Sequence, residues 1–369
     1  MESRMSKGSR RSGLLGIVAV AALLLTGCGS SVTPTDPGTD EESKAPASIT
    51  LAIASAAVAP KEEVVLYAVG AGTGRFDDEK LTVDYLNADG STAAIQAVLS
   101  GSADITVADA GSALAAAEKG APIVITGKLM HTQSYRIAVL DGSPIKTAAD
   151  VKGKRIGIIS LASGSRPFSE QFILQSGMSL DDVTLIPVGV GAQALAALQK
   201  GEVDVLALYT QAYTSIEFKE NVKFTYLEQP EMLNDVASYS FITTEKVLSE
   251  KKDAIARFMK VAYESMVFSK ANPTAAMELG YKAFPQLEKA PGDVPSFQAW
   301  LDSAAAPSWD GYEFGHISDA QWKTTLDYVT AAGQISGPMP IEKFWDPSLL
   351  EAAGSFDVDA VIREAENAK

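Results

Sequence analysis

The sequence predicts an α/β fold divided into two lobes, and three observations lead to this prediction. The chain has 369 residues, which is more than a single hydrophobic core normally holds. Short apolar runs alternate with helix-forming segments, an order typical of a parallel β-sheet. The loops that follow the apolar runs are rich in Ser, Thr, Gly and Asp, and open α/β sheets bind ligands at that edge.

Composition narrows the class of function. Hydrophobic residues make up 46% of the chain and charged residues 21%, as in globular proteins. The formal net charge of −15 argues against a nucleic-acid partner. A single cysteine excludes an intrachain disulfide and a CxxC-type metal site. The two histidines, His131 and His316, stand far apart, and no nucleophile–base pair is evident by spacing. We therefore expect no catalytic residue, no metal site and no cofactor.

The first 27 residues are predicted to be a signal peptide. A basic head precedes the apolar run 14–25, which is too short to span a membrane because a spanning helix needs about 20 residues. The following Leu-Thr-Gly-Cys28 resembles the lipobox of bacterial lipoproteins, which implies cleavage before Cys28 and its acylation, for example by palmitate. The alternative is a plain secretory peptide with an incidental cysteine. Residues 28–46 lack large apolar side chains almost entirely and are predicted to form a flexible tether.

The first half of the folded part is expected to alternate strands with helices. Glycine ends most of the helices, and polar N-caps begin them. The expected strands are 48–55, 81–86, 105–108 and 122–128, and the expected helices are 64–74, 92–100 and 109–120.

The stretch 134–169 is expected to carry the chain from one lobe into the other. It contains strands at 137–140 and 156–159, a short helix at 147–150, and a Ser/Gly-rich loop at 160–169 before a helix at 170–176. The basic residues 152–155 lie at the far end of their strand from that loop. We therefore do not count them as ligand contacts.

The second half repeats the alternation and then becomes helical. Strands are expected at 183–188, 203–208 and 238–243, and helices at 193–200, 253–269, 274–284 and 319–332. The region 289–310, which contains several prolines, is expected to be irregular.

Several segments, in this order, resemble one family. They are LYAVGAGTGRFDDEKLTVDY from Leu66, IQAVLSGSADITVADAGSALAAAEKGAPIVI from Ile95, SPIKTAADVKGKRIGI from Ser143, ALQKGEVDVLAL from Ala197, and the tail ISDAQWKTTLDYVTAAGQISGPMPIEKFWDPSLLEAA. Together they are similar to substrate-binding proteins of the NMT1/THI5-like, sulfonate- and nitrate-binding group.

The resemblance implies a two-lobed type II periplasmic-binding-protein fold with two crossover strands that close on a ligand. Lobe one would comprise 47–133 and 237–369 with the C-terminal helices, and lobe two 134–236. The implied role is an extracytoplasmic, membrane-anchored lipoprotein that acts as a monomer. It would deliver a small organic molecule to the permease of an ABC importer. Lobe closure would be driven by the extra ligand contacts made in the closed state.

Candidate ligand-binding residues lie in the loops between strands and helices. Helix N-termini offer unpaired N–H donors there, although each polar residue has the alternative role of a helix cap. The candidates are Ser55, Gly90, Ser91, Thr92, Asp109, Ser112 and Tyr239 in lobe one, Gln133 at the first crossing, and Ser160, Ser163, Gly164, Ser165, Arg166, Tyr209 and Gln211 in lobe two.

The chemistry of the ligand stays open between two classes. Arg166 suits a sulfonate or another anion, with a surface charge as its alternative role. Asp109 favours a ligand with hydrogen-bond donors, such as a pyrimidine. Tyr209, Tyr213 and Tyr239 are candidates to stack on an aromatic ligand, although packing is the commoner role of such tyrosines.

Two other functions compete with import. The resemblance includes eukaryotic THI5-like enzymes that make a pyrimidine from their own histidine and pyridoxal phosphate. Those enzymes need a cysteine-rich motif, whereas the single cysteine here is Cys28. The other alternative is a ligand-sensing lipoprotein that reports to a membrane receptor.

Overall fold

The computed structural model describes residues 44–161 and 163–368. The predicted signal peptide, Cys28 and nearly all of the predicted tether lie outside the described residues. Within the described ranges, no helix combines the length and the apolar character needed to cross a membrane.

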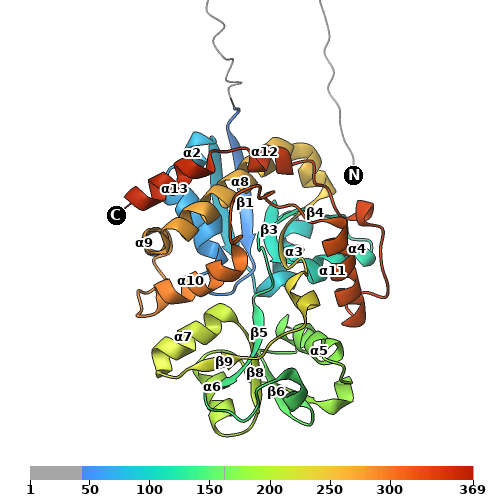
Figure 1. Cartoon of the computed structure of the whole chain (residues 1–369). Coiled ribbons are helices and arrows are strands. Elements are labelled where there is room, and N and C mark those ends of the chain that lie inside the picture. The colour runs from blue at the N-terminus through green and yellow to red at the C-terminus, as the bar shows by residue number, and fades with distance from the viewer. Residues whose placement is uncertain (1–43, 162, 369) are drawn as a thin grey trace, which may run out of the picture. The chain divides into compact units, whose positions relative to one another are not determined.

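The first of two five-stranded sheets forms the centre of lobe one (Figure 1). Its strand order is β2-β1-β3-β10-β4, with β2 and β3 both parallel to β1 and β10 antiparallel to both of its neighbours. The strands are β1 (Ala47–Ile53), β2 (Leu81–Asn87), β3 (Ile105–Asp109), β4 (Ile123–Lys128) and β10 (Tyr239–Thr244).

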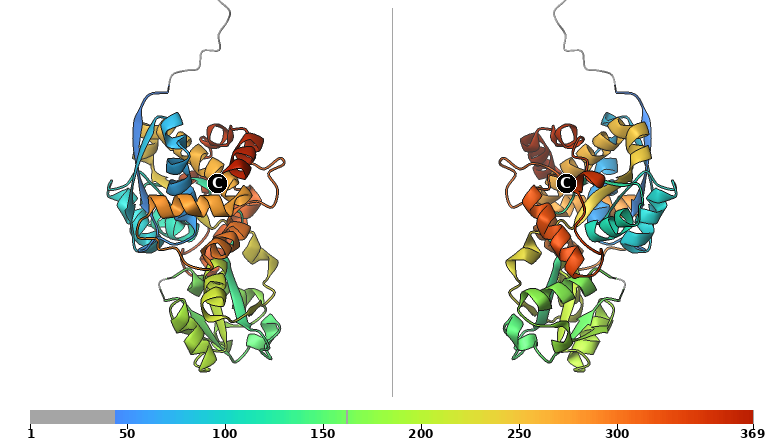
Figure 2. Two further views of the ribbon diagram at one scale, coloured as in Figure 1. Left: turned by 90° about the vertical axis from the view of Figure 1, so that its left-hand side faces the viewer. Right: turned by 90° about the vertical axis from the view of Figure 1, so that its right-hand side faces the viewer.

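The second sheet forms the centre of lobe two, and the views in Figure 2 show the same division into two lobes. Its strand order is β7-β6-β8-β5-β9, with β5 antiparallel to β8 and β9. The strands are β5 (Tyr135–Leu140), β6 (Arg155–Ile158), β7 (Thr184–Pro187), β8 (Val205–Tyr209) and β9 (Phe224–Tyr226).

Both sheets are mixed rather than wholly parallel, because each receives one antiparallel strand from a crossing segment. The chain passes between the sheets at 129–134 and again at 227–238. The start of β10 therefore lies beside the end of β3, with Tyr239 paired to Asp109. In the same way, the start of β5 lies beside the end of β8, with Tyr135 paired to Tyr209. We propose that the lobe boundaries fall at these two crossings.

Helices cover both sheets, and most begin and end close to the predicted positions. Lobe one carries η1 (Val64–Ala68, a π-helical turn), α1 (Val69–Gly72), α2 (Arg75–Asp78), α3 (Gly90–Leu99), α4 (Ala110–Glu118), α8 (Glu245–Ala271), α9 (Pro273–Ala283), α10 (Asp293–Ala304), α11 (Asp319–Ala331), η5 (Ile341–Lys343), α12 (Leu350–Gly354) and α13 (Val358–Asn367). Lobe two carries η2 (Ala148–Val151), α5 (Ser165–Gln175), η3 (Leu180–Asp182), α6 (Ala192–Gln199) and α7 (Thr210–Glu220), and η4 (Glu231–Asn234) lies on the second crossing.

Two predicted irregular regions contain helices. Helix α5 begins at Ser165 rather than at residue 170, because Pro167 lies in its first turn, where the missing N–H costs nothing. Helix α10 likewise carries Pro295 in its first turn, within the region predicted as irregular. Prolines that looked like helix breakers thus occupy helix starts.

Helix α10 braces the junction between the lobes. It packs against α7 of lobe two, and the Thr210 hydroxyl donates a hydrogen bond to the Ala299 carbonyl at 3.0 Å. The backbone N–H groups of His131 and Thr132 on the first crossing also donate to carbonyls of α10, at 2.7 and 2.9 Å. Helix α10 therefore contacts both lobe two and the first crossing.

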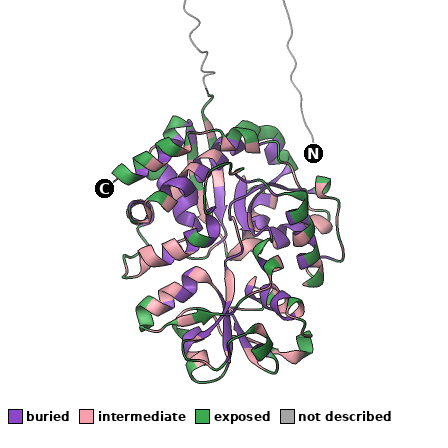
Figure 3. Cartoon of the chain, in the orientation of Figure 1, coloured by how far each residue is buried: buried purple, intermediate pink, exposed green. Residues whose placement is uncertain are grey.

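The largest core surrounds α8, which packs against sheet one and the other lobe-one helices, and buried segments run through both lobes (Figure 3). Phe258 of α8 stacks on Phe76 with ring centroids 6.2 Å apart and contacts Phe241 of β10 edge-on. These three side chains join two helices to the inserted strand.

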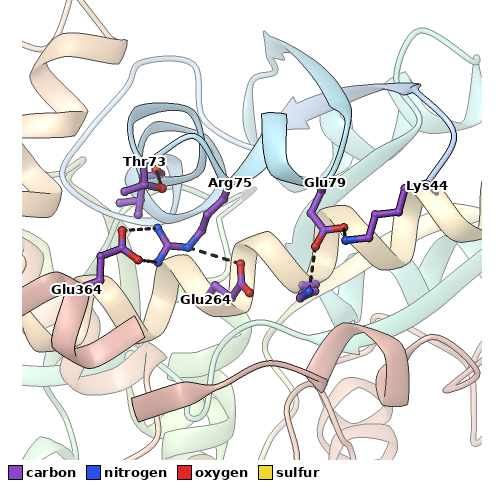
Figure 4. Close-up of polar contacts among 8 residues, drawn as sticks. Lys44, Thr73, Arg75, Glu79, Glu264 and Glu364 are labelled. Carbon is purple, nitrogen blue, oxygen red and sulfur yellow. Dashed lines mark hydrogen bonds and ion pairs between the residues drawn. The ribbon is translucent and has the colours of Figure 1, made fainter. Parts of the chain in front are cut away.

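An arginine clamp fixes α13 to lobe one (Figure 4). The Arg75 guanidinium donates to both carboxylate oxygens of Glu364, at 3.2 and 2.7 Å, and its Nε lies 3.5 Å from the Glu264 carboxylate. Arg75 is buried, whereas the Glu364 side chain is half exposed. The clamp thus joins α2, α8 and α13 through one cation.

The outer edge of sheet one is covered by the segment after η5. The Ile125 N–H donates to the Phe344 carbonyl at 2.7 Å, and the Asp346 N–H donates to the Ile125 carbonyl at 3.0 Å. This covering protects β4 from pairing with another chain. A surface cavity of about 450 Å³ lies between this segment and the start of α8, and it contains none of the predicted site residues.

Tyr213 joins two strands of sheet two, which leads to a testable prediction. Its fully buried hydroxyl accepts a hydrogen bond from the Leu208 N–H at 3.1 Å and lies within donating distance of the Leu206 carbonyl of β8, at 2.7 Å, and of the Arg136 carbonyl of β5, at 3.1 Å. Tyr213→Phe should lower the free energy of unfolding by about 1–3 kcal/mol, because the Leu208 N–H loses this hydroxyl partner. Urea unfolding measures the loss. Tyr226→Phe, at an exposed ring, should change stability by less than about 0.5 kcal/mol. Equal effects of the two replacements would contradict the prediction.

Candidate functional site

Three predicted residues of lobe one, Ser91, Asp109 and Ser112, meet where β3 ends and where α3 and α4 begin. Asp109 caps α4, and its carboxylate accepts hydrogen bonds from the Ser112 N–H at 2.9 Å and from the Ser112 hydroxyl at 3.2 Å. The Asp109 N–H donates to the Ser91 hydroxyl at 3.1 Å. Burial raises the pKa of Asp109, and the hydrogen bonds from Ser112 oppose that rise. The carboxylate therefore lies in a partly dehydrated position at the edge where ligands of α/β sheets bind.

Tyr239 lies beside this group on the neighbouring strand. Burial raises the pKa of Tyr239, the charges of Glu62 and Asp109 raise it further, and a hydrogen bond with Ser91 lowers it. These neighbours place the ring between Asp109 and the segment that follows β1. Because Tyr239 begins the inserted strand β10, its position depends on the second crossing.

Lobe two contributes Tyr135 and Tyr209 from paired strands. Their rings meet edge to face with centroids 6.2 Å apart, and Phe168 stacks on Tyr135 at 5.7 Å. Burial raises the pKa of Tyr135, and the nearby Tyr239, Tyr209 and Asp109 add to that rise. Tyr135 of lobe two is thus within electrostatic range of Tyr239 and Asp109 of lobe one, which makes this junction the candidate site.

A fourth tyrosine comes from the C-terminal part of lobe one. Tyr328 of α11 is 5% exposed, and its pKa is raised by burial and by the charges of Asp109 and Glu170. Gln334, just after α11, lies close to Gly111. A Cβ on that glycine would lie 2.5 Å from the amide oxygen of Gln334 and 3.1 Å from a carboxylate oxygen of Asp109. The chain after α11 therefore closes over Asp109. We refer to Tyr135, Tyr209, Tyr239 and Tyr328 as the tyrosine cluster.

Three charged residues after β1 complete the site. The Lys61 ammonium contacts the carboxylate of Glu62 and lies 3.0 Å from that of Glu63. Both glutamates are buried, and the Lys61 side chain is 15% exposed. Burial alone would lower the pKa of Lys61, but the two carboxylates raise it above its ordinary value. We refer to Lys61, Glu62 and Glu63 as the ion triad.

Glu63 predicts a distinct pH dependence of stability. Burial raises its pKa from 4.5 to about 7, while the charge of Lys61 opposes the rise. The folded state therefore holds a proton that the unfolded state has released, so this residue's contribution to stability decreases as pH rises from 4.5 to 7. We expect Glu63→Gln to remove that decrease when urea unfolding is compared at pH 5 and pH 8. Exposed Glu220→Gln serves as the control, and parallel pH curves for the wild-type protein and Glu63→Gln would refute the assignment.

The Ser/Gly loop of lobe two stabilises its own helix. The fully buried Ser165 hydroxyl accepts from the Ile159 N–H at 2.9 Å and contacts the Ser163 hydroxyl. The Ser163 N–H donates to the Ser160 carbonyl at 3.3 Å. A Cβ on Gly164 would lie 3.1 Å from the Tyr135 ring, so glycine lets that ring approach the loop. The loop thus supports the site mainly by holding Tyr135.

The structure does not bring the remaining predicted residues together at the tyrosine cluster. Thr92 is exposed on α3, and Arg166 is exposed and paired with Glu170 one turn further along α5 at 2.8 Å. The geometry therefore gives no support to the expected anion contact by Arg166. Ser55 donates to the Ala57 carbonyl at 2.6 Å, and Gly90 begins α3 with a φ of 84°.

Two predicted amide side chains are buried near the junction of the lobes. Gln133 is 5% exposed on the first crossing, with its amide oxygen 3.5 Å from the Tyr135 N–H. Gln211 is 8% exposed in the first turn of α7. Their positions agree with a role in the hinge, whereas the ligand contacts expected of them stay a prediction.

Sequence reasoning missed the ion triad, Tyr135, Tyr328 and Gln334 as site residues. Lys-Glu-Glu in a loop looks like a solvated surface segment, yet both glutamates are buried in the folded chain. Tyr328 and Gln334 follow α11, far from the motif-bearing loops in sequence. The sequence does place these charged residues soon after the first strand, and that position was the local feature that could have marked them as site residues. Within residues 44–161 and 163–368, no group of three His, Cys, Asp or Glu side chains is placed to hold a metal.

The fold is that of the two-lobed periplasmic binding proteins. It superimposes on the periplasmic aliphatic sulphonate binding protein SsuA of Escherichia coli with a TM-score of 0.64 and 17% identity, over 81% of this chain and 97% of that structure. The NMT1/THI5-like family model matches residues 63–276, and the chain belongs to this family.

Two relatives are similar to this chain over different shares of their length. The riboflavin-binding protein RibY of Chloroflexus aurantiacus is 25% identical over 89% of this chain and 94% of its own length. A 4-amino-5-hydroxymethyl-2-methylpyrimidine phosphate synthase of Candida albicans is 24% identical over 55% of this chain and 62% of its own. The first similarity thus extends over most of both proteins, whereas the second covers little more than half of each.

Proposed function

We propose that this protein is an extracytoplasmic solute-binding protein that captures a heteroaromatic ligand between its lobes and delivers it to an ABC importer. Acylated Cys28 and the tether at 28–46 would hold it at the membrane. The observation that carries the proposal is the tyrosine cluster around Asp109. Aromatic rings supply flat apolar surface for a ring ligand, and a buried carboxylate accepts hydrogen bonds from ring N–H groups.

The charge of the site favours a donor-bearing ligand over an anion. Asp109 is a partly buried carboxylate with no cation partner within the described residues. The ion triad sets two carboxylates against one cation, Lys61, and the charge of Arg166 is balanced by Glu170. A sulfonate or nitrate would enter a region with excess negative charge, which opposes binding in a partly dehydrated site. The near full-length similarity to a riboflavin-binding protein supports a flavin-like ring as the first ligand to test.

Isothermal titration of the purified protein with riboflavin tests this function. We expect one molecule bound per monomer with a Kd at or below about 1 µM, equivalent to about −8 kcal/mol. Recovered riboflavin should be chemically unchanged after prolonged incubation, as a binding protein requires. Ethanesulfonate and nitrate should give no binding. Binding of either anion without binding of riboflavin would overturn the heteroaromatic assignment, and accumulation of an altered product would overturn binding without turnover.

A further inference from the structure

The site has two chemically different polar groups, Asp109 and the ion triad, and the charges of each act on tyrosines of the cluster. The pKa of Tyr328 is raised by burial and then by the charges of Asp109 and Glu170. Burial raises the pKa of Tyr209. The charges of Glu62 and Glu63 raise it further, and the charge of Lys61 lowers it. The pKa of Tyr239 is affected by the charge of Asp109 and by the charges of Lys61 and Glu62 in the ion triad. Strands β1 and β3 are neighbouring parallel strands, with Ile53 paired to Val107, so the segment that carries the ion triad and the Asp109 cap leave sheet one at the same edge as separate groups.

The ion triad is an unusual group to bury, since its carboxylates have few partners. Glu63 is fully buried, and among the described residues neither of its carboxylate oxygens makes a hydrogen bond, apart from the ion pair with Lys61. Removing such charges from water costs several kcal/mol when hydrogen bonds do not compensate. A structural ion pair would normally acquire further donors, so the arrangement points to a partner that arrives from outside the chain.

Lys61 is the member of the triad that can meet a ligand. An ammonium group has three N–H donors, and within the described ranges its contacts are with Glu62 and Glu63. Its side chain keeps 15% exposure, whereas both glutamates are more deeply buried. The glutamates therefore hold the ammonium in position. A hydroxyl group suits this position because it can accept from Lys61 and donate to a carboxylate.

We infer that Lys61, positioned by Glu62 and Glu63, forms a second polar subsite that binds a hydroxyl-bearing arm of the ligand while Asp109 binds the ring. This inference rests on the proposed function and specifies the ligand further. The ligand is an aromatic ring system with donor groups at one end and a polyol arm that reaches the ion triad. Ring and arm are thus recognised by separate groups, which a pair of related ligands can distinguish.

Riboflavin and lumiflavin provide that pair, because lumiflavin has the same ring with a methyl group in place of the ribityl arm. Titrations at pH 8 would compare the wild-type protein with Lys61→Met and with the double variant Lys61→Met/Glu63→Gln. The double variant removes one charge of each sign, so the triad keeps the net charge of −1 that it has in the wild-type protein, and it serves if the single variant fails to fold. Exposed Lys200→Met is the matched control for loss of a lysine.

We expect the double variant to bind riboflavin at least about tenfold more weakly and lumiflavin within about twofold of the wild-type protein. Lys200→Met should leave both affinities unchanged. Equal weakening for both flavins, or no weakening for either, would overturn the inference while the proposed function stands. If the wild-type protein binds neither flavin, the inference fails together with the heteroaromatic assignment.

Discussion

Asp109→Asn should weaken riboflavin binding by about 10- to 100-fold, or about 1.4–2.8 kcal/mol. The replacement keeps the shape of the side chain and removes the negative charge that accepts a hydrogen bond from a ring N–H. Hydrogen bonds to charged groups contribute about 1.5–3 kcal/mol, and this one forms in a partly dehydrated site. Lumiflavin should lose the same factor because it carries the same ring. Titration calorimetry with both flavins measures the two changes.

The fold should tolerate this replacement, since asparagine also caps helix N-termini well. The Ser112 N–H that now donates to Asp109 can donate to the amide oxygen of asparagine. We expect the free energy of unfolding to change by less than about 1 kcal/mol. Asp357→Asn is the matched control, because Asp357 caps α13 through the Ala360 N–H at 2.9 Å, outside the site. Unchanged flavin affinity in Asp109→Asn would exclude the carboxylate as a ligand contact.

The largest expected effect on stability is at the arginine clamp, where Arg75→Met should lower the free energy of unfolding by about 3–5 kcal/mol. Removing the cation leaves the mostly buried Glu264 without its guanidinium partner and releases Glu364 of α13. Breaking one partner of a buried ion pair has a cost of this size. Burial already raises the pKa of Glu264, with Lys260 and Arg75 opposing the rise, so the lost cation should raise it further.

The double variant Arg75→Met/Glu264→Gln separates charge from packing. It removes the uncompensated carboxylate, so it should recover more than half of the lost stability. Arg166→Met is the matched control, because Arg166 forms an exposed pair with Glu170 and should change stability by less than about 1 kcal/mol. Urea unfolding gives all three values. A loss at Arg75 no larger than that at Arg166 would show that the clamp adds nothing to stability.

Local pattern was sufficient to predict most elements of the fold. Strands such as β1 and β3 are buried apolar runs, and Asp109 was recognisable as a helix cap because its side chain acts within four residues. The predicted family and the α/β class are confirmed by the family match and by the two mixed sheets. The direction of β5 and β10 was not recoverable from local pattern, because it depends on where the chain crosses between lobes.

The site was less predictable, since its members meet only in the folded chain. Ser91, Asp109, Tyr209 and Tyr239 follow or begin strands and were found by that rule. Lys61, Glu62 and Glu63 have the composition of an exposed loop, so the burial of both glutamates was not recoverable from local pattern. The expected role of Arg166 depended on the direction of its side chain, which the nearby Glu170 determines.

The insertion of β10 between β3 and β4 also constrains the order in which the protein folds. All five strands of sheet two lie in one continuous stretch of chain, from Tyr135 to Tyr226. Sheet one, in contrast, waits for a strand that follows this whole stretch, because Ile242 pairs with both Thr106 and Ile125. Pairings between distant residues form slowly. Lobe two can therefore complete its hydrogen-bonded sheet first, whereas lobe one keeps the facing edges of β3 and β4 unpaired until the chain returns.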